Sequence, residues 1–454
     1  MTKAVAGSAA ARISREPIVL EDLLENGQGV GRADGLVVFA TGGLPGETVR
    51  VAVDAVKRNY ASAHVTAIEV PSPARVASIC PVFPRCGGCQ VLHLEYAAQL
   101  DWKRRMVRDA LHRLGGLTSV DVDETVALPA TTATRYRNKA GLVTRFAGGA
   151  MQLGFYEARS HRVVAIDSCP VLLPRLDDAV KALVTMAREA PAPFEPSRHI
   201  VARASATGNE LVVAFNGQKP NRAAGAYVDE LRRRIPDLTG VMSSWDLENE
   251  NALFGARSAT LWGSPILRET VAGATLRFGI ESFFQINTAM LELIAEQLVD
   301  MLAGTGRVVD LYCGVGTFAV ILGKRGIATT GVEWFKPAAD ECAANAAANG
   351  VLNAAFEHAD AVEAVHGERG RTLLKGADAV ILDPPRKGCD ERVLTALAEN
   401  GVERVVYVSC NPATLARDAK ALAARGYRVQ RVTPYDMFPH TGHVEVVMTF
   451  VKGS

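Results

Sequence analysis

Long apolar runs, a strong net charge and abundant aromatic residues are all missing from this chain of 454 residues. No uninterrupted apolar stretch approaches the roughly 20 residues that a membrane-spanning helix requires, so we expect no membrane segment. Lys and Arg number 50 against 49 Asp and Glu, and the resulting net charge of +1 does not by itself indicate a nucleic-acid partner. The N-terminus lacks the apolar core of a secretory signal. We therefore expect a soluble, cytoplasmic protein and a monomer.

Cysteine is also scarce, with eight residues in the whole chain, and in the cytoplasm we expect them to be reduced, catalytic or metal-bound. Four of them share an uneven spacing, Cys-x5-Cys-x2-Cys plus a distant fourth, at Cys80, Cys86, Cys89 and Cys169. Glycine and proline beside them form turns that can direct four thiolates at one metal centre. An iron–sulfur cluster and a structural zinc ion both suit these ligands, and the spacing alone does not separate them.

Changes of pattern along the chain divide it into four parts. Residues 1–15 are typical of a loose tail. Residues 16–72 alternate short β runs with turn stretches such as Gly27–Gly31, which predicts a small β-barrel of the oligonucleotide-binding type. Residues 73–272 predict a central α+β domain that contains the four cysteines. Residues 273–454 alternate strands with helices, which predicts an α/β domain with a Rossmann-like, doubly wound sheet.

Two features of the N-terminal half favour RNA as a partner, each with an ordinary alternative. The motif Pro-Gly-Glu-x-Val-x-Val at Pro45–Val51 resembles the TRAM domain, an RNA-binding barrel, although a barrel can equally be a structural cap. A helix expected over residues 95–114 carries a row of cations opposite its apolar side, namely Lys103, Arg104, Arg105, Arg108 and Arg113. Residues 135–139 add a tyrosine among cations, as a phosphate-binding face with a stacking platform would. A charged helix face is more often merely solvated.

The C-terminal part contains the pattern of a nucleoside-binding site. The glycine turn Gly314–Gly316 follows a buried strand, and Glu333 follows the next strand. The turn is shorter than the dinucleotide fingerprint and lacks its third glycine, so it suits a nucleoside without pyrophosphate, for which S-adenosylmethionine is the natural candidate. Glu333 would hold the ribose hydroxyls and Asp360 would face the adenine. Groups near Tyr312 and Thr317 would flank the methionine part. These features predict a methyltransferase.

Two further residues are candidates for chemistry. Cys410 lies between a β-branched strand at Val405–Ser409 and a helix start at Asn411-Pro412. A helix N-terminus favours thiolate over thiol, so Cys410 is either a nucleophile or a buried structural cysteine. Glu445 alternates with apolar residues in the last strand, and is either an edge-strand surface group or a site acid of raised pKa.

Taken together, the motifs resemble the uracil-C5 RNA methyltransferase family over nearly the whole chain. The matching stretches are Ser409–Arg417, Phe438–Glu445, Ser282–Asn287 and Asp310–Gly316. The resemblance implies Cys410 as the nucleophile and Glu445 as the base. It also implies a set of cofactor contacts, Asp360 more weakly than the others: Gln285, Tyr312, Glu333, Asp383 and Asp360.

The cysteine spacing resembles that of family members with a [4Fe–4S] cluster, which implies Cys80, Cys86, Cys89 and Cys169 as its ligands. Members with both barrel and cluster resemble the 23S ribosomal RNA enzymes more than the transfer-RNA ones. We therefore expect 23S rRNA as the partner, with tRNA as the alternative. A redox-sensing iron–sulfur protein that binds RNA without catalysis is the alternative of a different class.

Two departures from the family pattern concern the cofactor and base contacts. Thr317 stands where many members have Asn, and Asp383-Pro-Pro-Arg replaces the Asp-Pro-Ala-Arg of some members. Either change can alter those contacts slightly.

Overall fold

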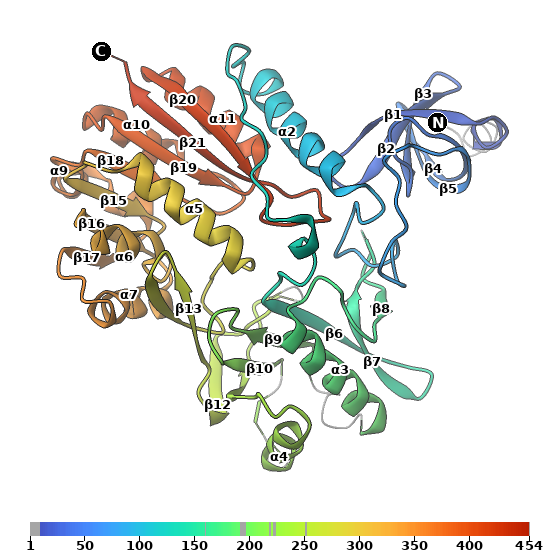
Figure 1. Ribbon diagram of the computed structural model, residues 1–454, viewed down its shortest axis with the longest axis horizontal. Helices are drawn as coiled ribbons and strands as arrows, with labels where there is room; N and C mark the ends of the chain where they lie inside the picture. The colour runs from blue at the N-terminus through green and yellow to red at the C-terminus, as the bar shows by residue number, and fades with distance from the viewer. Residues whose placement is uncertain are drawn as a thin grey trace.

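The computed structural model describes residues 10–158, 160–190, 197–217, 219–220, 224–249 and 252–453. Three folded regions follow one another along the chain: a small barrel, a central sheet with helices, and a C-terminal sheet with helices (Figure 1). Within this part of the chain, no helix combines the length and apolar character needed to cross a membrane.

Five strands close the N-terminal barrel in the order β1-β2-β3-β5-β4, which confirms the predicted barrel. Leu20, Val38 and Val49 are fully buried at its centre. The strands are β1 (Ile18–Leu23), β2 (Gln28–Ala33), β3 (Leu36–Thr41), β4 (Thr48–Val56) and β5 (Tyr60–Val70).

Two details of the barrel differ from the expectation. Gly29 and Gly31 belong to strand β2 and not to a turn. Glycine is required at these two strand positions because close packing leaves no room for a side chain. A Cβ atom would lie 2.7 Å from Leu20 Cδ1 at Gly29 and 2.6 Å from the Val19 oxygen at Gly31. Ile13 is 1% exposed and packs into the barrel core, so this part of the expected loose tail is ordered. Residues 1–9 of that tail lie outside the described residues.

The central region is built on a seven-stranded sheet with the order β12-β11-β10-β9-β6-β7-β8. Its strands are β6 (Lys139–Ala147), β7 (Ala150–Tyr156), β8 (Val163–Ala165), β9 (His199–Ala204), β10 (Leu211–Asn216), β11 (Gly240–Trp245) and β12 (Arg257–Gly263). Helices α3 (Pro174–Glu189) and α4 (Ala224–Arg234) pack their apolar residues into one core with this sheet. The mixture of strands and helices agrees with the α+β expectation.

The C-terminal sheet has the order β17-β16-β15-β18-β19-β21-β20. Its first five members pair in parallel, and β21 and β20 are antiparallel to their neighbours. The strands are β15 (Arg307–Leu311), β16 (Ala328–Glu333), β17 (Ala354–His358), β18 (Ala379–Leu382), β19 (Arg404–Ser409), β20 (Tyr427–Tyr435) and β21 (Glu445–Lys452).

Helices cover both faces of this sheet. The helices are α5 (Thr288–Met301), α6 (Thr317–Lys324), α7 (Lys336–Ala348), α8 (Ala361–Ala364), α9 (Gly367–Leu374), α10 (Glu391–Glu399) and α11 (Pro412–Ala423). Successive residues of β15 enter opposite cores: Val308 packs with α5 and α6, and Val309 packs with α10 and α11. This alternation explains why the parallel strands are apolar throughout. The predicted Rossmann-like sheet is confirmed.

A hairpin of β13 (Ile266–Val271) and β14 (Ala274–Gly279) precedes the C-terminal sheet. Leu267 and Leu276, one from each strand, are buried in the same core as helix α5. The domain boundary expected between residues 272 and 273 therefore falls inside this hairpin.

Helix α2 (Tyr96–Arg113) connects the barrel to the C-terminal domain. The indole N–H of Trp102 donates to the Leu23 oxygen of the barrel at 3.1 Å, while Val107 and Leu111 pack beside α11. Lys103, which the sequence places on the solvated face, is instead fully buried. Its ammonium group donates to Asp436 Oδ1 at 2.5 Å and to the Phe438 oxygen at 2.9 Å. The amphipathic pattern of helix α2 indicates one buried side, but residues of its polar side, such as Lys103, are buried as well.

We expect Lys103→Met to destabilise the protein strongly, because the neutral side chain leaves the Asp436 carboxylate buried without its partner. Loss of one member of a buried ion pair costs about 3–5 kcal/mol. Arg105→Met, on an exposed position of the same helix, should change stability by less than about 0.5 kcal/mol. The midpoint of urea unfolding measures both changes, and equal midpoints for the two variants would contradict this role of Lys103.

Candidate active site

Cys410 lies at the junction that the sequence predicts, between strand β19 and helix α11. Asn411 caps the helix through its side-chain oxygen, which accepts a hydrogen bond from the Ala413 N–H at 3.0 Å. Pro412 occupies the first helical position. The thiol is half-buried and forms no disulfide. It is therefore held at the carboxyl end of the sheet, where ligands bind in open α/β folds.

The surroundings of Cys410 favour the protonated thiol. Burial raises its pKa to about 11, the Glu445 carboxylate adds to this rise, and the Arg386 guanidinium opposes it. The loss of hydration on burial thus acts against the thiolate that the helix N-terminus favours.

Glu445 is buried and is not a surface group. It begins β21, which lies between β19 and β20 and is thus an interior strand, and the side chain is 1% exposed. Ser409 pairs with Val446, so the next positions in this antiparallel register, Cys410 and Glu445, meet at the same end of the sheet. Burial raises the pKa of Glu445 and the Asp383 carboxylate raises it further, whereas Arg386 lowers it.

Arg386 is the functional candidate that sequence reasoning missed. Its guanidinium interacts with both the Cys410 thiol and the Glu445 carboxylate. Its backbone oxygen accepts hydrogen bonds from Asn411 Nδ2 at 3.1 Å and from Thr414 Oγ1 at 3.2 Å, which attaches the loop after β18 to helix α11. The only signal was the Asp383-Pro-Pro-Arg motif, noted above merely as a departure from the family pattern.

The glycine turn after β15 has the geometry of a cofactor-binding loop. Gly314 and Gly316 have φ angles of 58° and 82°, and Gly316 forms the N-cap of helix α6, which Thr317 begins. Tyr312 also has a positive φ, 75°, a conformation that is uncommon outside glycine and often marks functional sites. Glu333 orders the turn by accepting hydrogen bonds from the Gly314 N–H at 2.9 Å and the Phe335 N–H at 2.7 Å.

Acidic residues gather at the same edge of the sheet. Burial raises the pKa of Asp383 to about 7, with a contribution from Glu333, and raises that of Asp310 to about 8, with a contribution from Asp383. Asp360 caps α8, its Oδ1 accepting from the Val362 N–H at 2.8 Å. Gln285 is 9% exposed, in the segment before α5. The strand ends thus bring Asp310, Glu333 and Asp383 together.

The four cysteines named above line one cavity of about 420 Å³ although Cys169 lies far along the chain from the others. All four are free thiols, and the Gly88 N–H donates to Cys86 Sγ at 3.4 Å. Among the residues that the structure describes, no three His, Cys, Asp or Glu side chains approach closely enough to hold a single metal ion. The donor set, four thiols around one space, suits the ligand chemistry of an iron–sulfur cluster.

The expected RNA-binding features are only partly exposed. Tyr136 is 6% exposed and its hydroxyl donates to the Pro439 oxygen at 3.1 Å, and Asn138 is fully buried. The interpretation of residues 135–139 as a stacking platform is therefore wrong. Arg104, Arg105 and Arg108 line a shallow surface depression beside helix α2 and remain candidates for phosphate contacts.

Two family models match the chain. The model described as tRNA (Uracil-5-)-methyltransferase matches residues 269–452, and the TRAM domain model matches residues 14–66. An RNA methyltransferase of Listeria innocua is 35% identical over 440 residues, covering 95% of this chain and 96% of that protein. An RNA methyltransferase of Thermosynechococcus vestitus is 37% identical over 437 residues, covering 94% of this chain and 96% of that protein.

A solved structure resembles nearly the whole molecule. The tRNA (uracil-54, C5)-methyltransferase of Pyrococcus abyssi, in complex with S-adenosyl-L-homocysteine, is 28% identical. The match covers 96% of this chain and 100% of that one, with a TM-score of 0.75.

We expect the Cys410 thiol to react with iodoacetamide increasingly fast as the pH rises towards its elevated pKa, because the thiolate is the nucleophile. In Arg386→Gln the guanidinium no longer favours the thiolate, so the pKa of Cys410 rises and the curve moves to higher pH by about one unit or more. Mass spectrometry of the peptide containing Cys410 measures the rates. An unchanged curve would exclude Arg386 as a modulator of this thiol.

Proposed function

Because this chain belongs to the RNA uracil-C5 methyltransferase family and carries its TRAM domain, we propose a covalent mechanism in which Cys410 is the nucleophile and Glu445 is the base. The protein is an S-adenosylmethionine-dependent RNA methyltransferase. The observation that carries the mechanism is that a half-buried thiol and a buried carboxylate lie directly beyond Ser409–Val446, the last paired position of β19 and β21.

The first step makes C5 of uracil nucleophilic. The Cys410 thiolate adds to C6, forming the C6–S bond, and the electron pair of the C5–C6 double bond is displaced towards O4 as an enolate. Since the free thiol is protonated at neutral pH, it must release its proton to solvent when the substrate binds. Arg386, which lowers the pKa of the thiol, stabilises the thiolate. The target base must leave any stack to reach the thiol.

The second half of the reaction needs a base beside C5. The enolate carbon attacks the methyl group supplied by S-adenosylmethionine, whose sulfur leaves with the electron pair as S-adenosylhomocysteine. Glu445 then removes the C5 proton, the C5–C6 double bond re-forms, and Cys410 leaves C6. The raised pKa of Glu445 suits a base that must accept a proton near neutral pH.

Substitution of the two residues should stop the reaction at different points. Cys410→Ala cannot activate C5, so we expect neither adduct nor methyl transfer. Glu445→Gln permits addition and methylation but not proton removal, so covalent complexes with methylated RNA should accumulate and turnover should fall by at least about 100-fold. Denaturing gels with labelled RNA detect the adduct as a shifted band. If Glu445→Gln turned over normally, the base would be another group, with His440 or His443 next in line.

For the cofactor, we propose that the Gly314–Gly316 turn and Glu333 hold the nucleoside, with Asp360 near the adenine. Groups near Tyr312 and Thr317 flank the methionine part, and Gln285 and Asp383 are further cofactor contacts. The positive φ angles of the turn and the carboxylate that fastens it support this assignment. When bound there, S-adenosylmethionine supplies the methyl group at the edge of the sheet where Cys410 and Glu445 lie.

We also propose that Cys80, Cys86, Cys89 and Cys169 bind a [4Fe–4S] cluster, a proposal supported by the cavity that all four thiols line. Protein purified without oxygen should be brown and contain about four irons per chain. Cys86→Ser removes a ligand and should lose iron and visible absorbance. Cys342→Ser, at a buried cysteine outside this cavity, should retain both. Stoichiometric zinc without visible absorbance would contradict the proposal.

As substrate we propose 23S rRNA, on the family resemblance of chains with both barrel and cysteine cluster, and a monomeric enzyme acting in the cytoplasm. The second candidate is tRNA. It is favoured by the Pyrococcus abyssi tRNA (uracil-54, C5)-methyltransferase, which aligns with 96% of this chain. A match of that extent means that domain composition alone is a weak guide to which RNA is methylated.

A further inference from the structure

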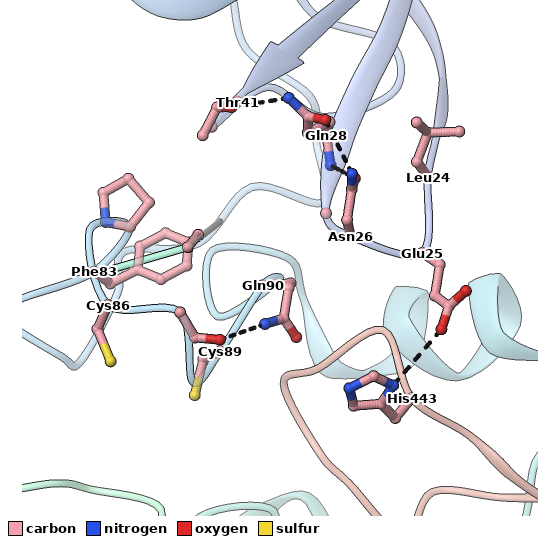
Figure 2. A pocket seen from close by; sticks show the side chains of 15 residues that line it. Leu24, Glu25, Asn26, Gln28, Thr41, Phe83, Cys86, Cys89, Gln90 and His443 are labelled. Atoms are coloured by element: carbon pink, nitrogen blue, oxygen red, sulfur yellow. Dashed lines mark hydrogen bonds and ion pairs between the residues drawn. The ribbon is translucent and has the colours of Figure 1, made fainter. Parts of the chain in front are cut away.

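A second cavity, of about 510 Å³, lies between the barrel and residues 80–91, the cysteine loop (Figure 2). It is lined by the turn between β1 and β2, by the end of β3, by the cysteine loop and by His443. Its lining side chains include Glu25, Asn26, Gln28, Thr41, Phe83, Gln90 and His443. The size falls within the range of small-molecule sites in proteins.

The polar groups of this cavity are held in place by one another. Asn26 donates to Gln28 Oε1 at 3.0 Å and accepts from the Gln28 N–H at 3.1 Å, while Gln28 donates to Thr41 Oγ1 at 3.1 Å. Gln90 donates to the Gly87 oxygen at 2.8 Å and accepts from the Gly442 N–H at 3.3 Å. In these contacts Asn26 and Gln90 each use one of two amide N–H groups, which leaves one donor of each for a ligand.

An aromatic ring and a carboxylate complete the lining. Phe83 lies 4.9 Å from His93 between ring centroids, which fixes its orientation. Glu25 lies 3.6 Å from His443 Nδ1, and its interaction with His443 lowers the pKa of the carboxyl group, so it is an acceptor at neutral pH. A flat apolar surface beside amide donors and a carboxylate acceptor matches a nucleobase, which has a π face and a polar edge.

The cavity also lies close to the reacting groups. Phe83, Gln90 and His443 line both this cavity and the neighbouring cavity of the four cysteines, whose wall includes Arg386. Arg386 in turn contacts the Cys410 thiol. An RNA with one base at Cys410 therefore has a second, preformed space nearby, beside the cysteine cavity and not through it.

We propose that this cavity binds the base of one unpaired RNA nucleotide that neighbours the target uridine in the folded substrate. The inference rests on the proposed function and deepens it, because it assigns substrate selection partly to the barrel. Asn26 and Gln90 would read the polar edge of that base, and Phe83 would stack on its face. In this proposal the barrel forms part of the substrate site as well as anchoring the RNA.

The test pairs a change in the protein with a change in the RNA. The probe is the shortest 23S rRNA or tRNA fragment that the wild-type enzyme methylates, with the nucleotides around the target replaced one at a time by abasic sites. For wild type, one abasic position should raise KM about tenfold, the cost of one lost base-stacking contact. Asn26→Ala and Phe83→Leu should raise KM similarly with the intact RNA, and kcat should stay within about twofold.

The decisive measurement is the KM of the Asn26→Ala enzyme with the abasic RNA. If the lost base occupies the cavity, the abasic RNA should impose little further increase in KM on Asn26→Ala. Phe146→Leu, at an exposed phenylalanine of β6 outside the cavity, is the matched control and should behave as wild type. Asn26 belongs to the barrel and not to the loop that carries Cys80, Cys86 and Cys89, and iron content measured for both variants separates its effect from any loss of the cluster in Phe83→Leu.

Additive penalties at every abasic position, or an unchanged KM in Asn26→Ala, would overturn the proposal while leaving the methyltransferase assignment intact. A wild-type enzyme that methylates no RNA would instead refute the proposed function. The two failures are therefore distinguishable in one set of measurements.

Discussion

The ion pair between Lys103 and Asp436 fixes the loop that leads to the proposed base. This loop runs from the end of β20 to Glu445, the first residue of β21. The buried ammonium group of Lys103 holds both Asp436 and the Phe438 oxygen. Two N–H groups of the cysteine loop, those of Gln90 and Val91, donate to the His440 oxygen, each at 3.0 Å. Helix α2 and the cysteine loop thus both form hydrogen bonds to the loop between β20 and β21.

The arrangement ties three distant parts of the chain to one reaction centre. A Cβ atom on Gly442 would lie 1.6 Å from the backbone oxygen of Glu25. The turn between β1 and β2 of the barrel is therefore in direct contact with the loop before Glu445. The same loop borders the cavity of the four cysteines through Phe438 and His443. A change in the position of the barrel, of helix α2 or of the cysteine loop should therefore shift Glu445 through direct contacts with the loop before it, and not through the sheet.

The sequence was sufficient for features that depend on local pattern. The strand–Cys410–helix junction, the glycine turn and the parallel sheet follow from apolar periodicity and capping residues, which act over a few positions. Lys103 and Tyr136 were misplaced because their burial comes from segments about 300 residues away, at Asp436 and Pro439. The raised pKa of Cys410 was missed for the same reason: hydration is lost through tertiary packing, which a helix-end argument does not contain.

The central claim is that this protein methylates C5 of a uridine in RNA. Its most direct test is to map 5-methyluridine in the 23S rRNA and tRNA of a strain that lacks the gene, before and after complementation. The account predicts that a 5-methyluridine site disappears, returns with the wild-type gene, and stays absent with Cys410→Ala. The RNA in which the site disappears decides between the two substrate candidates. A full complement of 5-methyluridine in both RNAs of the deletion strain would contradict the account.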